Sequence, residues 1–421
     1  GLAWDLGNPD AQVVPSPGPL TNIPFITANF NPLKGPMVTQ SLRGMANHGP
    51  MHWRGDRTGG NDEASAQPDS GSFDEDAAFR KFNAAFVGLL GRDEQIPDED
   101  MQAFTDFVLQ VTYPPNPVRN LDSSLTVEQQ SGRDFWFGPS SILTFPLNCN
   151  GCHRLDPTNN AEFGVFHPGL FGSDAQQSFA FQNQVFKSAH MRNAYQKVGM
   201  FGHPDTFGIF NPGNNEHQGD QIRGFGYSHD GNVDTLFRFN SVFVFNEQPG
   251  NETGIPVDAE GNQIRSDLEQ FMLAFDSNMA PVVGQQVTLR NNAAVVGARI
   301  NLLKARAEAG ECDLVAKIRV AGVEGGWLYT NDGHFQSNVA AVHLSSAALA
   351  LLSTVLTRPL TYTCVPPGTG ERTALDRDLA AVTFAHFLLY LFYIWAPLYV
   401  PVYLHDVLGI SWSNLGWMFS I

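Results

Sequence analysis

The spacing of apolar residues predicts helices in the first third of the chain. Over residues 79–89, three phenylalanines and a leucine recur at positions i, i+3, i+7 and i+10, which places them on one face of a helix. Residues 101–111 show the same type of spacing. The prolines of residues 114–117 end this second helix, because proline cannot continue a helix.

Capping signals and apolar stripes predict three further helices. Thr126, with Gln129 three positions later, forms a capping box that starts a helix running toward a cysteine pair. Ser266 and Glu269 form a second capping box at the head of an apolar stripe. Residues 293–309 are interpreted as one more helix.

Outside these helices, one strand and two long loop regions are predicted. Over residues 314–320, every second residue is apolar, and the residues between them are one valine, one lysine and one arginine. This alternation indicates a half-buried strand. Residues 1–70 and 154–235 contain Pro, Gly, Asn and Asp every few positions. Both regions are therefore interpreted as mostly loop.

The end of the chain is strongly apolar. Residues 383–404 include His386 but no Asp, Glu, Lys or Arg, and such a run is long enough to cross a bilayer core of about 30 Å. Its tyrosines and its tryptophan are typical of membrane interfaces. The sequence therefore predicts a transmembrane helix here, with a buried core helix as the alternative.

Composition limits the classes of partner. The chain has 421 residues, of which 25 are Lys or Arg and 42 are Asp or Glu, and its formal net charge is −17. A nucleic-acid partner is not expected, because binding to phosphates needs a basic surface. Hydrophobic residues make up 43% of the chain and charged residues 16%, which indicates a folded protein with a real core.

The motif with the most specific chemistry is Cys149-Asn150-Gly151-Cys152-His153. The pattern C-x-x-C-H is the signature of covalent haem attachment. Two thiols one helical turn apart add to the haem vinyl groups, and the adjacent histidine becomes the proximal iron ligand. The upstream aromatic residues 135–137 and Phe145 can pack against the porphyrin.

Three alternatives compete with a haem at this motif. A zinc site needs two more ligands at comparable spacing, and the chain has no second cysteine pair. A thioredoxin-like redox pair needs a βαβ context, which the flanking sequence lacks. A local disulfide between Cys149 and Cys152 would constrain little.

The sixth iron ligand decides whether a haem transfers electrons or binds external ligands. Met200 is the first candidate, because flanking glycines let its segment approach the haem face closely. Met272 is second; it lies on an apolar helical stripe, where methionine commonly serves as core. The wider set of candidates also contains Met191, Met279, His190, His203 and His229.

Cys312 and Cys364 are the two remaining cysteines. A haem protein assembled outside the reducing cytoplasm can retain disulfides. A bridge between these two would contribute about 4 kcal/mol in the chain-entropy model. The alternative is two isolated thiols, because sequence alone does not give their separation.

Several segments together resemble the bacterial dihaem cytochrome c peroxidase-like superfamily. They are the motif at 149–153, Gly-Arg-Asp-Phe at 132–135, His-Met-Arg-Asn-Ala-Tyr at 190–195, and the His-Asp-Gly and Thr-Leu elements within 225–236. The resemblance covers about residues 1–290. It implies a mainly helical cytochrome c fold, haem c as cofactor, a redox protein or small electron donor as partner, and a periplasmic or other extracytoplasmic bacterial location.

Members of that superfamily carry two haem motifs, whereas this chain contains one. Residues 39–43 and 51–57 resemble the segment that faces the first haem, and residues 4–7 resemble the sequence that follows a first haem motif. We therefore expect the chain to begin just after that motif, with an incomplete peroxidatic site. His52 and Arg54 are the candidate catalytic residues of such a pocket.

The tail from Tyr399 to Ile421 resembles part of a major facilitator superfamily transporter. The domains expected are a remnant of a first cytochrome domain (1–120), a haem domain (121–290), a small α+β extension (291–378) and a truncated transmembrane segment (379–421). The fold class expected is thus mainly α, with long loops, an α+β satellite and a membrane helix through 383–404 that anchors the protein.

The function predicted is one-electron transfer by a c-type cytochrome. The alternatives are a dihaem peroxidase-like oxidoreductase that needs a second haem, and a transporter fragment fused to a cytochrome domain. The sequence indicates neither the redox partner nor the oligomeric state.

Overall fold

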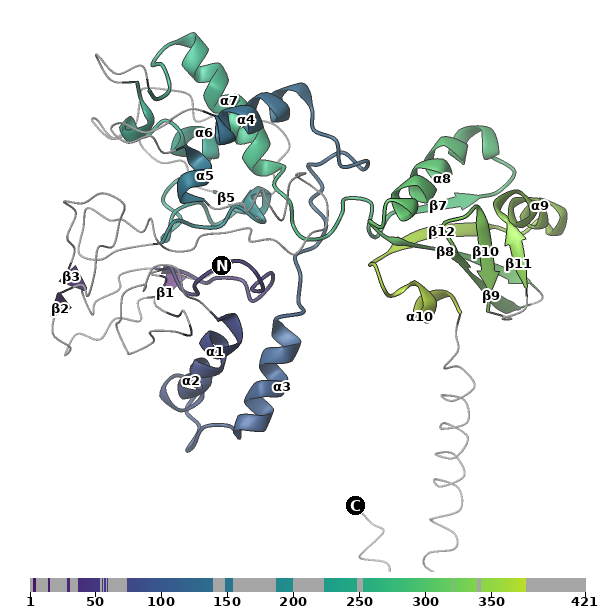
Figure 1. The fold of residues 1–421 in the computed structure, drawn as a ribbon, viewed down its shortest axis with the longest axis horizontal. Coiled ribbons are helices and arrows are strands. Elements are labelled where there is room, and N and C mark those ends of the chain that lie inside the picture. The colour runs from purple at the N-terminus through teal and green to yellow at the C-terminus, as the bar shows by residue number, and fades with distance from the viewer. Residues whose placement is uncertain are drawn as a thin grey trace, which may run out of the picture. The chain divides into compact units, whose positions relative to one another are not determined.

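The chain divides between Val283 and Gly284 into two compact units (Figure 1). The structure is a computed structural model. It describes residues 37–53, 55, 57, 59, 74–138, 148–153, 187–199, 223–247, 253–320, 322–338 and 342–375, together with the short strands β1 (Ala3–Trp4), β2 (Val14–Pro15) and β3 (Asn29–Phe30).

In the first unit, three helices surround a small apolar core. They are α1 (Glu75–Arg80), α2 (Ala84–Gly88) and α3 (Asp98–Val108). The predicted helix over 79–89 is present as α1 and α2, joined by a 3₁₀ turn. The second predicted helix is α3, and Phe79 packs with buried Met101 and Val108 in the core.

The helix α4 (Val127–Phe137) begins where its capping box predicts. The hydroxyl of Thr126 accepts a hydrogen bond from the Gln129 N–H at 3.2 Å. In return, the Gln129 side-chain oxygen accepts one from the Thr126 N–H at 3.0 Å. This reciprocal pair satisfies two donors at the start of the helix and confirms the predicted start.

The helix α7 (Ala259–Leu273) begins seven residues before the predicted capping box at Ser266. Asp258 is the residue that caps it, because its carboxylate accepts a hydrogen bond from the Gly261 N–H at 2.9 Å. The predicted start was therefore wrong. The predicted apolar stripe is confirmed, since Leu268, Phe271 and Met272 are all buried.

The helices α4 and α7 pack directly against each other (Figure 1). Gly132 of α4 lies at the contact, where an added Cβ atom would be 2.1 Å from the backbone oxygen of Asp267. The two backbones approach this closely because Gly132 has no side chain. The other elements of this unit are β4 (Met37–Val38), α5 (Cys149–Cys152), β5 (Val198–Gly199), β6 (Arg223–Gly224) and α6 (Leu236–Phe239).

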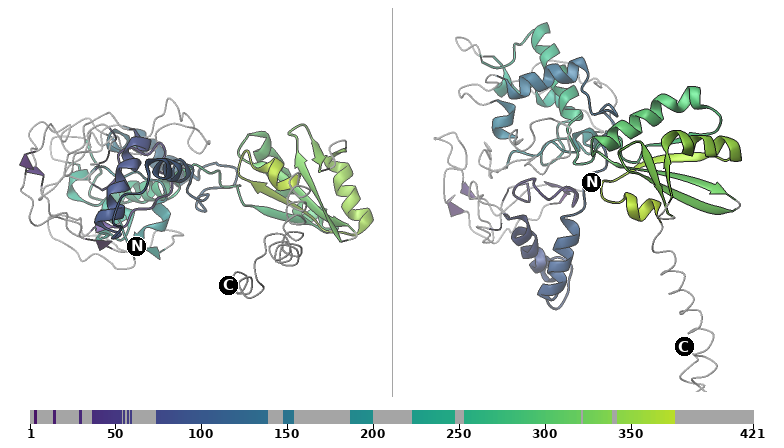
Figure 2. Two further views of the ribbon diagram at one scale, coloured as in Figure 1. Left: turned by 90° about the horizontal axis from the view of Figure 1, so that it is seen from below. Right: turned by 45° about the vertical axis from the view of Figure 1, so that its right-hand side comes forward.

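The second unit is built on a six-stranded antiparallel sheet. In chain order its strands are β7 (Gln286–Leu289), β8 (Asp313–Val320), β9 (Val323–Tyr329), β10 (His334–Ser337), β11 (His343–Ser345) and β12 (Leu360–Val365), and the spatial order is β11-β10-β9-β8-β12-β7. The helix α8 (Ala293–Glu308) lies by β7, β12 and β8, and α9 (Ser346–Leu356) lies by β10 and β11 (Figure 2). A short helix, α10 (Gly370–Ala374), follows β12.

The predicted fold class was wrong. The described residues form a mixed α and β protein, because the chain beyond residue 284 builds a six-stranded sheet where a small satellite was expected. Within the described ranges, every helix is too short or too polar to cross a membrane. The segment 383–404, to which the transmembrane helix was assigned, lies outside the described residues.

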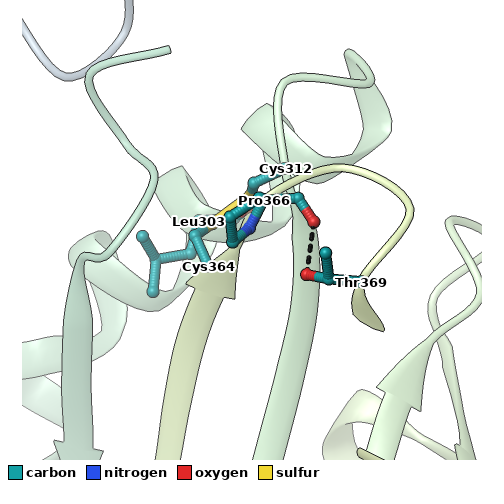
Figure 3. Close-up of a disulfide and its surroundings, with 5 residues drawn as sticks. All are labelled: Leu303, Cys312, Cys364, Pro366 and Thr369. Carbon is teal, nitrogen blue, oxygen red and sulfur yellow. Dashed lines mark hydrogen bonds between the residues drawn. A yellow bond between two sulfur atoms is a disulfide. The ribbon is translucent and has the colours of Figure 1, made fainter. Parts of the chain in front are cut away.

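A disulfide joins Cys312 and Cys364, which are 52 positions apart in the chain and 5.5 Å apart at their Cα atoms. Figure 3 shows the bond between the residue before β8 and a residue of β12. Both cysteines are buried, and the Leu303 backbone oxygen of α8 lies 3.9 Å from the Cys364 sulfur. The bridge therefore ties the strand pair β8–β12 at the point where α8 covers it.

Candidate haem-binding site

The cysteine motif forms a single helical turn, α5. The His153 N–H donates to the Cys149 carbonyl at 2.9 Å, so the turn continues to the histidine. The spacing of Cys149 and Cys152 places both residues on one side of this turn. Cys149 is half-buried and packs against the core that α4 and α7 share, whereas only the backbone of Cys152 is described.

Among the described residues, the ring of His153 has one hydrogen-bond partner. Its Nδ1 lies 2.5 Å from the carbonyl oxygen of Ala189. Because a carbonyl oxygen only accepts, Nδ1 carries the proton and the lone pair is left on Nε2. Burial lowers the pKa of His153, although the bond to Ala189 opposes this shift. A neutral imidazole with Nδ1–H bound to a backbone carbonyl is the form in which histidine ligates metals.

Trp136 of α4 lies beside the His153 ring. The two ring centroids are 5.7 Å apart, and the Trp136 ring also meets Phe271 at 5.8 Å and Phe275 at 5.4 Å. The indole is only 1% exposed. Its Nε1–H is buried with no hydrogen-bond partner among the described residues. Since a buried indole N–H usually finds an acceptor, this atom indicates an acceptor that the described residues do not supply.

The residues around the motif fit a haem. The core of this region is apolar and aromatic, and Phe135, Phe137 and Cys149 pack against it. A porphyrin needs such surroundings, together with an oriented histidine and a few polar groups for its periphery. The His153 tautomer and the unpartnered Trp136 N–H supply the last two requirements.

Two of the methionine candidates for the sixth position have defined surroundings. Met272 is buried in α7, and its sulfur accepts a hydrogen bond from the Asn240 amide at 3.6 Å. Met191 is also buried in the apolar core. Met200, the first candidate, lies outside the described residues, as does His203. Across the described ranges, no three His, Cys, Asp or Glu side chains form a group that could hold a metal ion.

Of the two candidate catalytic residues, the structure describes His52. The His52 ring packs edge-on against Phe82, with centroids 4.9 Å apart, next to the core of α1 and α3. Its backbone adopts a positive φ of 64°, as expected in the tight turn that the Met51–Arg57 bridge closes. Arg54 lies outside the described residues.

One buried acid was not predicted from the sequence as a functional group. Glu269 of α7 is fully buried, and one of its oxygens accepts a hydrogen bond from the Phe237 N–H at 3.0 Å. Burial raises its pKa to about 8, with backbone hydrogen bonds from Phe237 and Leu236 opposing the shift. In the sequence, Glu269 matches the second position of a capping box with Ser266, a pattern that does not indicate its burial.

Comparisons with known proteins add little to this geometry. No protein-family model matches the chain, and no curated protein matches it either. Among solved structures, the hydrazine synthase of Kuenenia stuttgartiensis pressurised with xenon is similar over 65% of this chain and 76% of that chain, with 19% sequence identity and a TM-score of 0.33. This weak likeness does not establish membership of the dihaem peroxidase-like superfamily, which stays a prediction.

Proposed function

We propose that this chain is a c-type cytochrome that transfers single electrons through a haem attached to Cys149 and Cys152 and ligated by His153. The hydrogen bond from His153 Nδ1–H to the Ala189 carbonyl carries the proposal. It leaves Nε2 unprotonated in the one histidine that directly follows the attachment motif.

When bound, the haem supplies the one-electron couple between ferric and ferrous iron. The chain's own residues orient and tune the site. The Ala189 carbonyl holds the ring of His153 in one rotation and increases the basicity of Nε2. Trp136, Phe271 and Phe275 exclude water from the side of the imidazole.

Covalent attachment gives the direct test. We expect the full chain, matured with a haem-attachment system, to retain haem after denaturing electrophoresis. The double variant Cys149→Ser, Cys152→Ser should lose covalent haem. The matched control is Cys312→Ser, Cys364→Ser, which removes the same number of cysteines from the second unit, together with their disulfide, and should keep covalent haem. A wild-type chain without covalent haem, or haem retained in the first double variant, would contradict the proposal.

A further inference from the structure

A group of cationic side chains lies beside the haem motif in the first unit. The segment 187–197 packs on the segment 44–53, and its basic residues are largely buried. The ammonium of Lys187 donates to the Pro50 carbonyl, and the Arg192 guanidinium donates to the carbonyls of Gly44, Ala46 and Asn47 at 3.2 Å each.

Two imidazoles complete this group. The rings of His48 and His190 meet edge to face, with centroids 5.2 Å apart. His48 is 8% exposed, and its Nδ1 lies 3.0 Å from the Met45 carbonyl, to which it donates. That bond leaves Nε2 of His48 as an acceptor while the ring is neutral, and as a second donor once the ring is protonated.

The charged side chains of the described residues that act on both imidazoles are positive. Burial lowers the pKa of His48 well below its usual value, and Lys187, Arg192 and Lys197 lower it further. The pKa of His190 is also lowered well below its usual value, first by burial and then by Lys197, His48, Arg192 and Lys187. Asp276 acts on Arg192 and Arg119, and it is not among the groups that shift the pKa of either imidazole.

Two donors in this group lack partners. The buried Nδ1 of His190 has no hydrogen-bond partner in the described part of the chain. The ammonium of Lys197 makes a cation–π contact at 6.0 Å from the Trp53 ring centroid, and no described carboxylate pairs with it. Burial lowers the pKa of Lys197 to about 8. A buried imidazole nitrogen and an ammonium without hydrogen-bond partners are costly away from water, and one anion would satisfy both, because a nearby negative charge favours the protonated form of His190.

We propose that His48, His190 and Lys197 form a binding site for a carboxylate, and that this carboxylate is a propionate of the haem held by His153. The assignment to haem rests on the function proposed above. Ala189 connects the two sites, because its carbonyl accepts the His153 Nδ1–H and the next residue is His190. Propionates are the anionic groups of a haem, and imidazolium, ammonium and guanidinium groups bind carboxylates through charge-assisted hydrogen bonds.

The test uses the haem-loaded full chain and the variant Lys197→Met. Positive charge near a haem favours the ferrous state, because reduction adds an electron. We therefore expect Lys197→Met to lower the midpoint potential measured by spectroelectrochemistry and to shift the propionate bending bands in resonance Raman spectra. Lys197→Arg, which keeps the charge, should retain the wild-type potential.

The matched control is Lys317→Met. Lys317 lies on β8 of the second unit, where it pairs with Glu324 at 2.8 Å, so the same chemical change is made in the other unit and leaves the residues of the proposed site unchanged. We expect this variant to leave the potential and the propionate bands unchanged. Unchanged values in Lys197→Met, at normal haem content, would overturn the carboxylate site.

Acetate distinguishes the two sources of a carboxylate. A site filled by propionate should show no saturable spectral response to added acetate. A saturable response in the wild type that Lys197→Met abolishes would show that the site takes a free carboxylate, and would overturn the propionate assignment. Absence of covalent haem in the wild type would refute the proposed function and this assignment together, whereas an unchanged Lys197→Met variant with normal haem refutes the site alone.

Discussion

Replacing Gly132 with alanine tests the packing that shapes the haem-binding region. A Cβ atom at this position would lie 2.1 Å from the Asp267 oxygen, 2.6 Å from the Asp267 carbonyl carbon and 2.9 Å from the Phe271 Cβ. The two closest atoms belong to the backbone of α7 and cannot rotate away. The helices α4 and α7 would therefore have to separate by about 1 Å to restore ordinary contact.

The expected change in stability follows from two opposing effects. Alanine gains about 0.5–1 kcal/mol over glycine inside a helix. Overpacking a tight contact costs about 1–3 kcal/mol, and here the separation also loosens the contact of Trp136 with Phe271. We expect a net destabilisation of about 1–2 kcal/mol, which corresponds to a fall in Tm of roughly 2–8 °C for a unit of this size.

Gly297→Ala is the matched control. Gly297 lies inside α8 of the second unit, and a Cβ there would meet no atom within 4 Å. The same substitution should thus stabilise that unit by about 0.5–1 kcal/mol. In the haem-loaded protein of the proposed function, thermal melts followed in the Soret band would report on the first unit, and far-UV circular dichroism reports on both. A Gly132→Ala protein as stable as the wild type would refute the close helix contact.

Three other predictions address the remaining groups. Reducing the Cys312–Cys364 bridge should lower the stability of the second unit by about 2–4 kcal/mol. The far-UV transition of the reduced protein should then occur at a lower temperature than that of the oxidised protein, while the Soret melt stays unchanged. Identical far-UV transitions in the reduced and oxidised proteins would contradict this prediction. Because burial raises the Glu269 pKa to about 8, the folded state binds the proton more tightly. The free energy of unfolding should therefore fall by up to about 1.4 kcal/mol per pH unit as the pH rises from roughly 4.5 to 8. A Glu269→Gln variant that keeps this slope in urea titrations would show that Glu269 is not its source. Met200→Ala should remove a sulfur-to-iron charge-transfer band of the ferric protein. Met272→Leu should retain this band, because the Met272 sulfur accepts a hydrogen bond from Asn240. The reverse result would make Met272, and not Met200, the sixth iron ligand.

Local signals in the sequence predicted the helices well. The capping box of α4 needs only residues three positions apart, so its start could be read directly. The start of α7 was missed because the helix is capped by Asp258, eight residues before the predicted cap at Ser266. Asp258, followed by Gly261, was a signal available in the sequence.

The sheet was underestimated although part of its signal was present. Residues 360–365 alternate strictly, with Leu360, Tyr362 and Cys364 buried and the residues between them half-buried. The neighbouring strand β9 contains Gly325 and Gly326, which weaken its pattern. Gly326 is needed there, because a Cβ would lie 1.7 Å from the Ala374 oxygen. Close packing against α10 thus removed the alternation by which β9 could have been recognised.

The orientation of His153 depends on contacts that no local pattern contains. The carbonyl that fixes its ring belongs to Ala189, 36 positions further along the chain. Three residues later, the Arg192 guanidinium binds carbonyls of the segment 44–47, and the Lys187 N–H donates to the Trp53 carbonyl at 3.0 Å. The carbonyl that orients His153, the axial ligand in the proposed function, has to stay in place. The bonds on either side of Ala189 therefore give the segment 44–53 a part in positioning His153. The region that resembles the surroundings of a first haem therefore has a structural role at the motif that this chain contains.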